Sequence, residues 1–328
     1  MAVFTQVTTQ EAQSLLDQLQ LGEVLELKGI EGGIENTNYF LDCKRPQIAE
    51  DEAPAHYVLT LFERLSKEEL PFYLHLMKHL ANKGIPVPDP QTNPQGELLF
   101  DVAGKPAALV NKLNGKSHLQ PTSSHCATVG QMLAKMHLAG KDFEHQQPNL
   151  RGLQWWLETT PSILDFLEPQ NKALLQQETA FQLNLSRTSA YQSLPRGPIH
   201  ADLFRDNVMF DGEQLTGFFD FYFAGTDTWL FDISVCLNDW CIDLTTGALI
   251  VERMSAFLDA YQQERPLSQQ ERALFNPMLR AAALRFWISR LWDFYLPREA
   301  NLLKAHDPKH FENILKLRVH HPVHYFQS

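Results

Sequence analysis

Three polar residues between positions 200 and 220 have the types and spacing needed to move a phosphoryl group. Asn207 follows Asp202 after five positions, and Asp220 comes thirteen positions later. Phosphoryl transfer needs one carboxylate to orient an acceptor hydroxyl and receive its proton, and oxygen ligands that hold Mg²⁺ on the phosphates. Mg²⁺ takes one or two carboxylate or amide oxygens together with phosphates and water. We therefore expect Asp202, Asn207 and Asp220 to be catalytic, the last two as metal ligands.

A hairpin between the two expected metal ligands explains their spacing. Residues 208–210 and 215–221 are strand-like, and Asp211-Gly212 between them is a strong hairpin signal. A strand that returns through this turn brings the second ligand back beside the first. Each part alone has an ordinary explanation, because Asp-Gly hairpins are common at surfaces and a D-x-x-x-x-N pattern arises by chance. The combination favours a catalytic site.

A glycine-rich stretch near the N-terminus has the composition of a phosphate-binding turn. It lies between strand-like residues 24–27 and 39–41. Glycines let backbone N–H groups approach phosphates closely because they carry no side chain. A plain hairpin turn would be the preferred interpretation without the residues at 200–220. The expected nucleotide contacts here are Gly32, Gly33, Asn36, Thr37 and Asn38.

Composition narrows the class of protein. The chain has 328 residues, enough for two lobes, and a net charge of −11, which argues against nucleic acid or an anionic membrane as a partner. Its four cysteines form no C-x-x-C pair and suit a reducing compartment. The sequence has no basic leader and no apolar run near the roughly 20 residues of a membrane span. We expect a soluble cytoplasmic protein.

Apolar periodicity predicts an α+β fold in two lobes. Residues 1–113 form the N-terminal nucleotide-binding lobe, and residues 114–328 form a mainly helical lobe with the catalytic loop and substrate site. The N-terminal strands are expected at 24–27, 39–41, 57–62, 98–100 and 107–113, with helices at 9–20 and 66–82. Further helices are expected near 152–167, 170–190, 229–243, 247–264 and 268–296. The histidine-rich stretch 320–324 is expected to be an exposed tail.

The chain resembles the aminoglycoside phosphotransferase and choline kinase superfamily, whose fold is similar to that of protein kinases. HADLFRDN at 200–207 and FFDF at 218–221 carry that likeness. Within the superfamily, GIENTNYFLD (33–42), YVLTLFE (57–63) and ALRFWISRLWDFY (283–295) are similar to the type II homoserine kinases. The likeness covers nearly the whole chain. It implies a small antiparallel-sheet N-lobe and a mainly helical C-lobe.

The resemblance also implies an activity. It is the transfer of the ATP γ-phosphate to the side-chain hydroxyl of L-homoserine, in threonine biosynthesis, with Mg²⁺. Asp202 would orient the hydroxyl and accept its proton late, staying ionised without a large pKa shift. Asp232 is similar to the acid that ties down the catalytic region in this superfamily.

The substrate contacts are less defined by the sequence. A free carboxylate and a free ammonium need one cationic and one anionic partner. The expected candidates are Arg205, Arg285, Arg290 and Asp293. Arginines and aromatic residues on a long amphipathic helix also commonly pack against neighbouring helices.

One position departs from the kinase pattern. Kinases place a lysine on the strand equivalent to 57–62, where it holds the α and β phosphates, and this chain has Thr60 there. Lys112 is our expected replacement, although Lys28 and Arg64 are open to the same role. The same threonine belongs to the YVLTLFE pattern, so it does not argue strongly against activity.

Two alternative functions stay open. One is a kinase for another small alcohol, such as choline, an aminoglycoside or a thiosugar. The other, motivated by Thr60, is a non-catalytic nucleotide-binding module, although such a module has no chemical need for the complete set at 202, 207 and 220. No nucleic-acid or membrane partner is expected, and a homodimer is compatible with the sequence.

Overall fold

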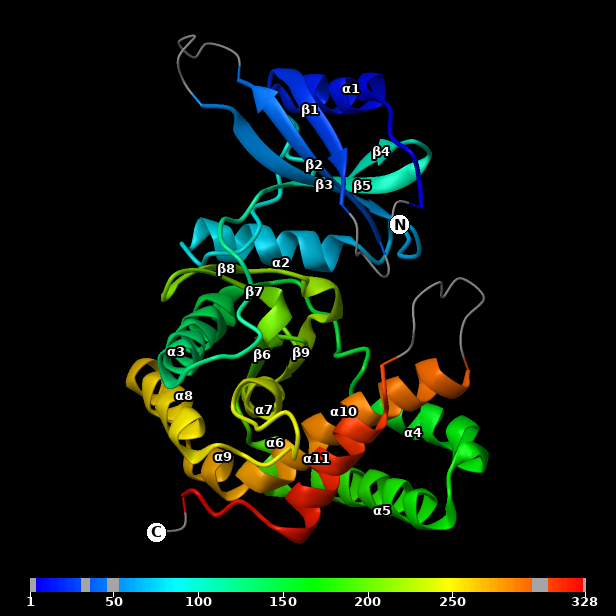
Figure 1. Ribbon diagram of the computed structural model, residues 1–328, viewed down its shortest axis with the longest axis vertical. Helices are drawn as coiled ribbons and strands as arrows, with labels where there is room; N and C mark the ends of the chain where they lie inside the picture. Colours follow the sequence, from blue (N-terminus) through cyan, green and yellow to red (C-terminus); the bar gives the residue numbers. More distant parts are fainter. Residues whose placement is uncertain (1–3, 31–35, 46–52, 297–305, 327–328) are drawn as a thin grey trace. The chain divides into compact units, whose positions relative to one another are not determined.

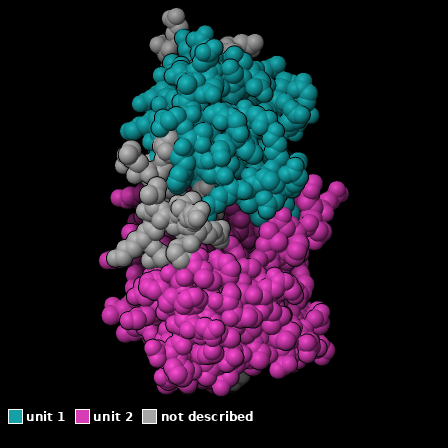
Figure 2. All heavy atoms as spheres, turned by 90° about the vertical axis from the view of Figure 1, so that its right-hand side faces the viewer, with its two compact units in different colours: residues 1–114 teal, residues 115–328 magenta. Residues whose placement is uncertain are grey.

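The computed structural model describes residues 4–30, 36–45, 53–296 and 306–326. The chain divides into two compact units, residues 1–114 (unit 1) and 115–328 (unit 2), coloured separately in Figure 2. The division falls one residue after the lobe boundary expected from the sequence. The two units have the sheet-rich and helix-rich contents of the predicted α+β class, which is confirmed.

Unit 1 is built on a five-stranded antiparallel sheet with the strand order β1-β2-β3-β5-β4. The strands are β1 (Glu23–Gly29), β2 (Asn36–Lys44), β3 (Ala55–Phe62), β4 (Phe100–Val102) and β5 (Lys105–Asn111). Alternate residues of β2 are buried, among them Tyr39 and Leu41, as the two-residue period of a strand requires. Those side chains form a core with the apolar face of α1 (Thr9–Leu19), which lies against the sheet in Figure 1.

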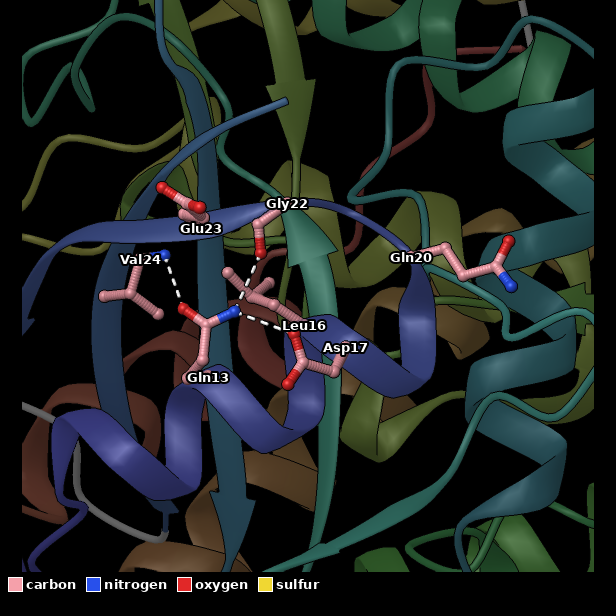
Figure 3. A pocket seen from close by; sticks show the side chains of 7 residues that line it. All are labelled: Gln13, Leu16, Asp17, Gln20, Gly22, Glu23 and Val24. Atoms are coloured by element: carbon pink, nitrogen blue, oxygen red, sulfur yellow. Dashed lines mark hydrogen bonds between the residues drawn. The ribbon is translucent and has the colours of Figure 1, made fainter. Parts of the chain in front are cut away.

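Local side-chain hydrogen bonds fix where α1 begins and how β1 leaves it. Thr8 and Glu11 form a capping box at its first turn. Figure 3 shows Gln13 reaching from α1 to the following turn. Its amide nitrogen donates to Gly22 O at 3.0 Å, and its oxygen accepts from Val24 N–H at 2.9 Å. The shallow hollow around these residues is therefore part of the α1–β1 connection.

The second helix of unit 1 is shorter than the sequence predicted. The expected start at Ser66 is wrong, because α2 runs from Pro71 to Asn82. Ser66 N–H donates to the Glu69 carboxylate at 2.9 Å in a separate turn. Proline at the first helical position then starts α2, since its missing N–H has no helical acceptor there.

Unit 2 is mainly helical and has two small two-stranded sheets. The helices are α3 (Ser123–Ala139), α4 (Leu153–Ile163), α5 (Pro169–Ser186), α6 (Ser189–Gln192), α7 (Trp229–Trp240), α8 (Val251–Glu264), α9 (Gln269–Ala273), α10 (Phe275–Tyr295) and α11 (Lys309–His320). One sheet pairs β6 (Arg196–Ile199) with β9 (Gly225–Thr228), and the other pairs β7 (Val208–Asp211) with β8 (Gln214–Phe218). No helix among the described residues is long and apolar enough to cross a bilayer.

Helix α7, all of whose residues are buried, packs against α10, α3 and α8. Figure 1 shows α7 near the centre of unit 2. Helices α3 and α8 approach so closely that a Cβ on Gly130 would lie 2.3 Å from the carbonyl oxygen of Phe257. Glycine at this position therefore allows the two backbones to meet.

One prediction for the C-terminal part of the chain is wrong, and a second is confirmed in most of its residues. The expected helix 268–296 is divided at Leu274 into α9 and α10. The region before residue 320 contains α11, which buries Phe311, Ile314 and Leu315, so the histidine-rich stretch begins at the end of a packed helix. His320, His321, Pro322 and His324 are exposed, and residues 321–326 are irregular, so the expected exposed tail is present after α11.

Candidate active site

The loop that follows β6, residues 200–207, is anchored by one buried carboxylate. The backbone N–H groups of His200 and Ala201 donate to the Asp232 carboxylate at 2.9 and 2.8 Å. His137 Nε2 lies 3.0 Å from the same carboxylate. Burial acts to raise the pKa of Asp232, but the hydrogen bond and charge of His137 and the contacts with His200 outweigh it, so its pKa is lowered. Asp232 thus has the tethering position that the family resemblance implied.

The Asp232→Asn variant is expected to be less stable by about 3 kcal/mol, because a buried acceptor shared by several donors would be replaced by a group with one oxygen. At least one buried N–H would face the new NH₂. Urea unfolding measures the change in the free energy of unfolding. Asp165→Asn is the control, since the Asp165 side chain is 92% exposed and its pair with Lys172 contributes little. An unfolding midpoint equal to that of the unmodified protein would contradict the tethering role.

Helix α7 holds the catalytic loop with a stripe of four side chains: Asp232, Cys236, Asp239 and Trp240. Their spacing of 4, 7 and 8 residues from the first places them on one helical face. Trp240 Nε1 donates to Leu203 O at 2.9 Å, and the Cys236 thiol lies 3.6 Å from the same oxygen. Two acids seven residues apart in an apolar helix were a signal for this face, of which the sequence pattern pointed only to Asp232.

The hairpin β7–β8 returns the chain to the catalytic loop as predicted. Phe219 N–H donates to Asn207 O at 3.0 Å, which places the residue before Asp220 directly beside Asn207. Gly212 occupies the turn with a φ of +58°. His200 Nε2 lies 2.9 Å from the Phe219 carbonyl oxygen, joining the start of the loop to the same point.

The two expected metal ligands have geometries that suit a cation. Asn207 Nδ2 donates to the backbone oxygen of Asp202 at 2.9 Å, so its Oδ1 is directed away from that bond. Asp220 has a φ of +66°, in the left-handed region that Asp and Asn tolerate better than most residues. The negative charge of Asp220 raises the pKa of Asp202, which indicates that the two carboxylates are close enough to interact electrostatically. A divalent cation fits such a donor set.

Asp202 differs electrostatically from the expectation. Burial raises its pKa well above the usual range, and the charges of Asp220 and Asp206 add to that effect. The positive charge of Arg285 opposes it. The prediction of a carboxylate without a large pKa shift is therefore wrong for the protein alone, because the sequence revealed neither the burial of Asp202 nor the number of acids around it.

The expected substrate contacts lie in different surroundings. The guanidinium of Arg205 is bound within the protein, donating from Nε to Asp239 Oδ2 at 3.0 Å, from Nη1 to Leu119 O at 2.9 Å, and from Nη2 to Asp239 O. Arg290 lies over the Phe311 ring at 4.4 Å. Arg285 is buried and interacts electrostatically with Asp202 and, more weakly, with Asp293. Arg205 consequently supports the loop.

The expected nucleotide contacts in unit 1 are described only in part. Gly32 and Gly33 lie outside the described residues. Asn36 begins β2 opposite Phe62 on β3. Thr37 Oγ1 donates to Glu63 Oε1 at 2.7 Å and accepts from Phe4 N–H at 3.0 Å. The Thr37 hydroxyl is thus part of the internal structure of unit 1.

Thr60, which stands where kinases have a lysine, also forms a hydrogen bond within unit 1. Thr60 Oγ1 donates to Asn38 Oδ1 at 2.7 Å across the β2–β3 pair. Lys112, the expected replacement, has its Nζ 4.4 Å from the centroid of the Phe40 ring. A different lysine, Lys105, pairs with Glu63 at 3.1 Å. No ligand role for any of these side chains follows from these contacts.

A D-x-x-x-x-N loop fixed to a buried helix, and a hairpin that returns an aspartate to its asparagine, define a kinase-like phosphotransferase. The model of the phosphotransferase enzyme family matches residues 26–267. The chain is 59% identical to homoserine kinase of Polaromonas naphthalenivorans (strain CJ2), over 98% of this chain and 99% of that protein. It is 54% identical to homoserine kinase of Janthinobacterium sp. (strain Marseille), over 97% and 96%. The chain belongs to the phosphotransferase enzyme family, and its sequence groups it with the homoserine kinases.

Solved structures with the same fold confirm the predicted kinase-like architecture. Amicoumacin kinase matches with a TM-score of 0.68 and 17% identity, over 94% of this chain and 92% of that chain. Choline kinase from Cryptosporidium parvum Iowa II matches with a TM-score of 0.63 and 13% identity, over 95% of both chains. At these identities the likeness concerns the fold alone.

Proposed function

We propose that this protein is an ATP-dependent homoserine kinase that converts L-homoserine to O-phospho-L-homoserine, a reaction of threonine biosynthesis. The observation that carries the proposal is the complete set of Asp202, Asn207 and Asp220 on a loop and hairpin that are bonded to each other. Identities of 54–59% over nearly full length to homoserine kinases support the choice of substrate.

In the proposed reaction, Asp202 orients the side-chain hydroxyl of homoserine and receives its proton as the new phosphorus–oxygen bond forms. Deprotonation is late in a loose transition state, so a strongly basic carboxylate is not required. The raised pKa of Asp202 nevertheless makes it a better proton acceptor once it is ionised. Arg285 favours that ionised form through its positive charge.

Asn207 and Asp220 are the residues that would hold Mg²⁺. Bound there, the ion would supply charge neutralisation for the transferring phosphoryl group. Its charge would also counteract the effect of Asp220 on the pKa of Asp202. We propose that backbone N–H groups between Gly32 and Asn38 cover the ATP phosphates, as the glycine-rich composition of that stretch suggests.

A substrate panel tests the proposal. L-homoserine, choline and kanamycin are each supplied with MgATP, and ADP release is followed for all three. L-homoserine is expected to have a kcat/KM at least about 100-fold above the others, because a site that binds polar substrate groups strongly rejects molecules that lack them. Turnover of choline or kanamycin without turnover of homoserine would make the assignment wrong. ADP release equal to the enzyme-free blank with every acceptor would favour the non-catalytic alternative.

A further inference from the structure

Two arginines on α10 differ in what their Nε and Nη2 donors bind. Arg280 donates from Nε to Glu178 Oε2 at 2.9 Å and from Nη2 to Glu178 Oε1 at 2.5 Å. This is a side-on pair in which two parallel N–H groups bind one carboxylate. Arg285 follows five residues later, and its Nε and Nη2 are buried without a hydrogen-bond acceptor in the part of the chain that the structure describes.

Arg285 differs in this respect from the other buried arginines of unit 2. Arg205 is bound to Asp239, and Arg265 donates to both oxygens of Glu271. Arg318 donates to Asn238 Oδ1 and to Gly247 O. The only described hydrogen bond of the Arg285 side chain runs from Nη1 to Ser289 Oγ at 3.3 Å. The N–H donors on the edge formed by Nε and Nη2 are therefore unpaired among the described residues.

An unpaired guanidinium edge is unfavourable in a buried position, because the desolvation of its donors is not compensated. Only 3% of the Arg285 surface is exposed. The pKa of Arg285 is lowered to about 10, chiefly by burial; the charge of Asp202 opposes this effect and that of Arg151 adds to it. The group stays cationic at neutral pH, so its unpaired donors can bind an anionic acceptor.

Aromatic contacts hold the Arg285 side chain in place. Its guanidinium carbon lies 3.9 Å from the centroid of the Phe286 ring and 5.0 Å from that of Phe223. Arg151 lies 5.9 Å from the same Phe223 ring, which indicates a pair of cations around it. A guanidinium fixed by ring contacts loses little conformational freedom when it binds a planar anion.

The unpaired Nε–Nη2 edge of Arg285 lies in the catalytic region. Asp202 is the acid that acts most strongly on Arg285, and Phe223 comes three residues after Asp220. No described hydrogen bond joins Arg285 to the Asp202 carboxylate, so Asp202 does not occupy the edge. A substrate bound next to Asp202 by its hydroxyl can therefore present a second group to Arg285.

We propose that the Nε–Nη2 edge of Arg285 binds the α-carboxylate of the amino-acid substrate and makes the enzyme selective for acceptors that carry a carboxylate. The proposal rests on the proposed homoserine kinase activity. A carboxylate matches the paired donors in shape and charge, as Glu178 does for Arg280. Lysine would retain the charge but not the paired donors.

The test compares L-homoserine with L-homoserine amide, which keeps the ammonium and the hydroxyl but has no carboxylate. The unmodified enzyme is expected to prefer L-homoserine by about 10²-fold or more in kcat/KM. In Arg285→Lys, kcat/KM for L-homoserine is expected to fall about 10²-fold, chiefly through KM, while the value for the amide changes less than about 3-fold. Arg280→Lys is the matched control, expected to lower stability without changing the ratio of the two substrates.

The outcomes separate the two proposals. If the unmodified enzyme does not phosphorylate L-homoserine, the proposed function fails, and the carboxylate assignment fails with it. If it does, but Arg285→Lys loses activity equally with both acceptors, the function stands and the carboxylate assignment is overturned. That second result is expected if Arg285 acts only on Asp202 or on ATP. Should Arg285→Lys fail to fold, equal use of the acid and the amide by the unmodified enzyme overturns the assignment by itself.

Discussion

The Asp202→Asn variant is expected to lose about 10²–10⁴-fold in kcat, because asparagine cannot accept the proton of the acceptor hydroxyl. The two side chains have nearly the same shape. The hydrogen bonds of the loop use the backbone of Asp202, whose oxygen accepts from Asn207 Nδ2. The fold and the binding of ATP should therefore be retained. Removing a carboxylate whose pKa is raised by burial should, if anything, stabilise the fold.

Single-turnover measurements with MgATP and L-homoserine give the change in the chemical step. Isothermal titration with a non-hydrolysable ATP analogue checks nucleotide binding. Asp211→Asn is the control in the same region, since Asp211 is exposed at the hairpin turn and Asn-Gly forms this turn as well as Asp-Gly. Turnover of Asp202→Asn within a few-fold of the unmodified enzyme would remove Asp202 from its proposed role.

The second large effect is expected from Asp220→Asn, which removes the negative charge that Asp220 contributes to the two proposed Mg²⁺ ligands, since Asn207 is neutral. Asparagine adopts the left-handed conformation of Asp220 as readily as aspartate, so the backbone should not change. We expect kcat to fall about 10²–10³-fold, since the metal contributes several kcal/mol to the stabilisation of the transition state. The Mg²⁺ concentration for half-maximal rate should rise at the same time.

A titration of rate against free Mg²⁺ at fixed ATP measures both changes. Glu213→Gln is the matched control, because it also removes one negative charge from the hairpin but its side chain is 65% exposed at the turn. An Asp220→Asn enzyme with the Mg²⁺ dependence of the unmodified protein would show that Asp220 is not a ligand. The role of Asn207 would then need a separate test.

Features encoded by neighbouring residues were predictable from the sequence. The Asp-Gly turn, the apolar strands on both sides of it and the resulting contact between residues 207 and 219 all depend on local conformation. The capped helix at the N-terminus and the five strands of unit 1 follow from short patterns as well. The family likeness then identified the kinase-like fold.

Features that depend on distant residues were not predictable in this way. Arg205 and Asp239 form a pair that fixes the loop, and nothing in the separate stretches shows that they meet. The raised pKa of Asp202 depends first on burial and then on acids from the loop, the hairpin and α7. Likewise, the unpaired edge of Arg285 becomes visible only when every nearby acceptor has a known position.

The stripe on α7 has a consequence for how this enzyme can move. Four side chains on two turns of one helix hold the loop through its backbone and through Arg205, so the loop and α7 form one stiff body. Motions that admit substrates or release products must then take place in other parts of the chain. An insertion of one residue within α7 would rotate the side chains after it by about 100° around the helix axis. Those side chains would then lose their contacts with the loop.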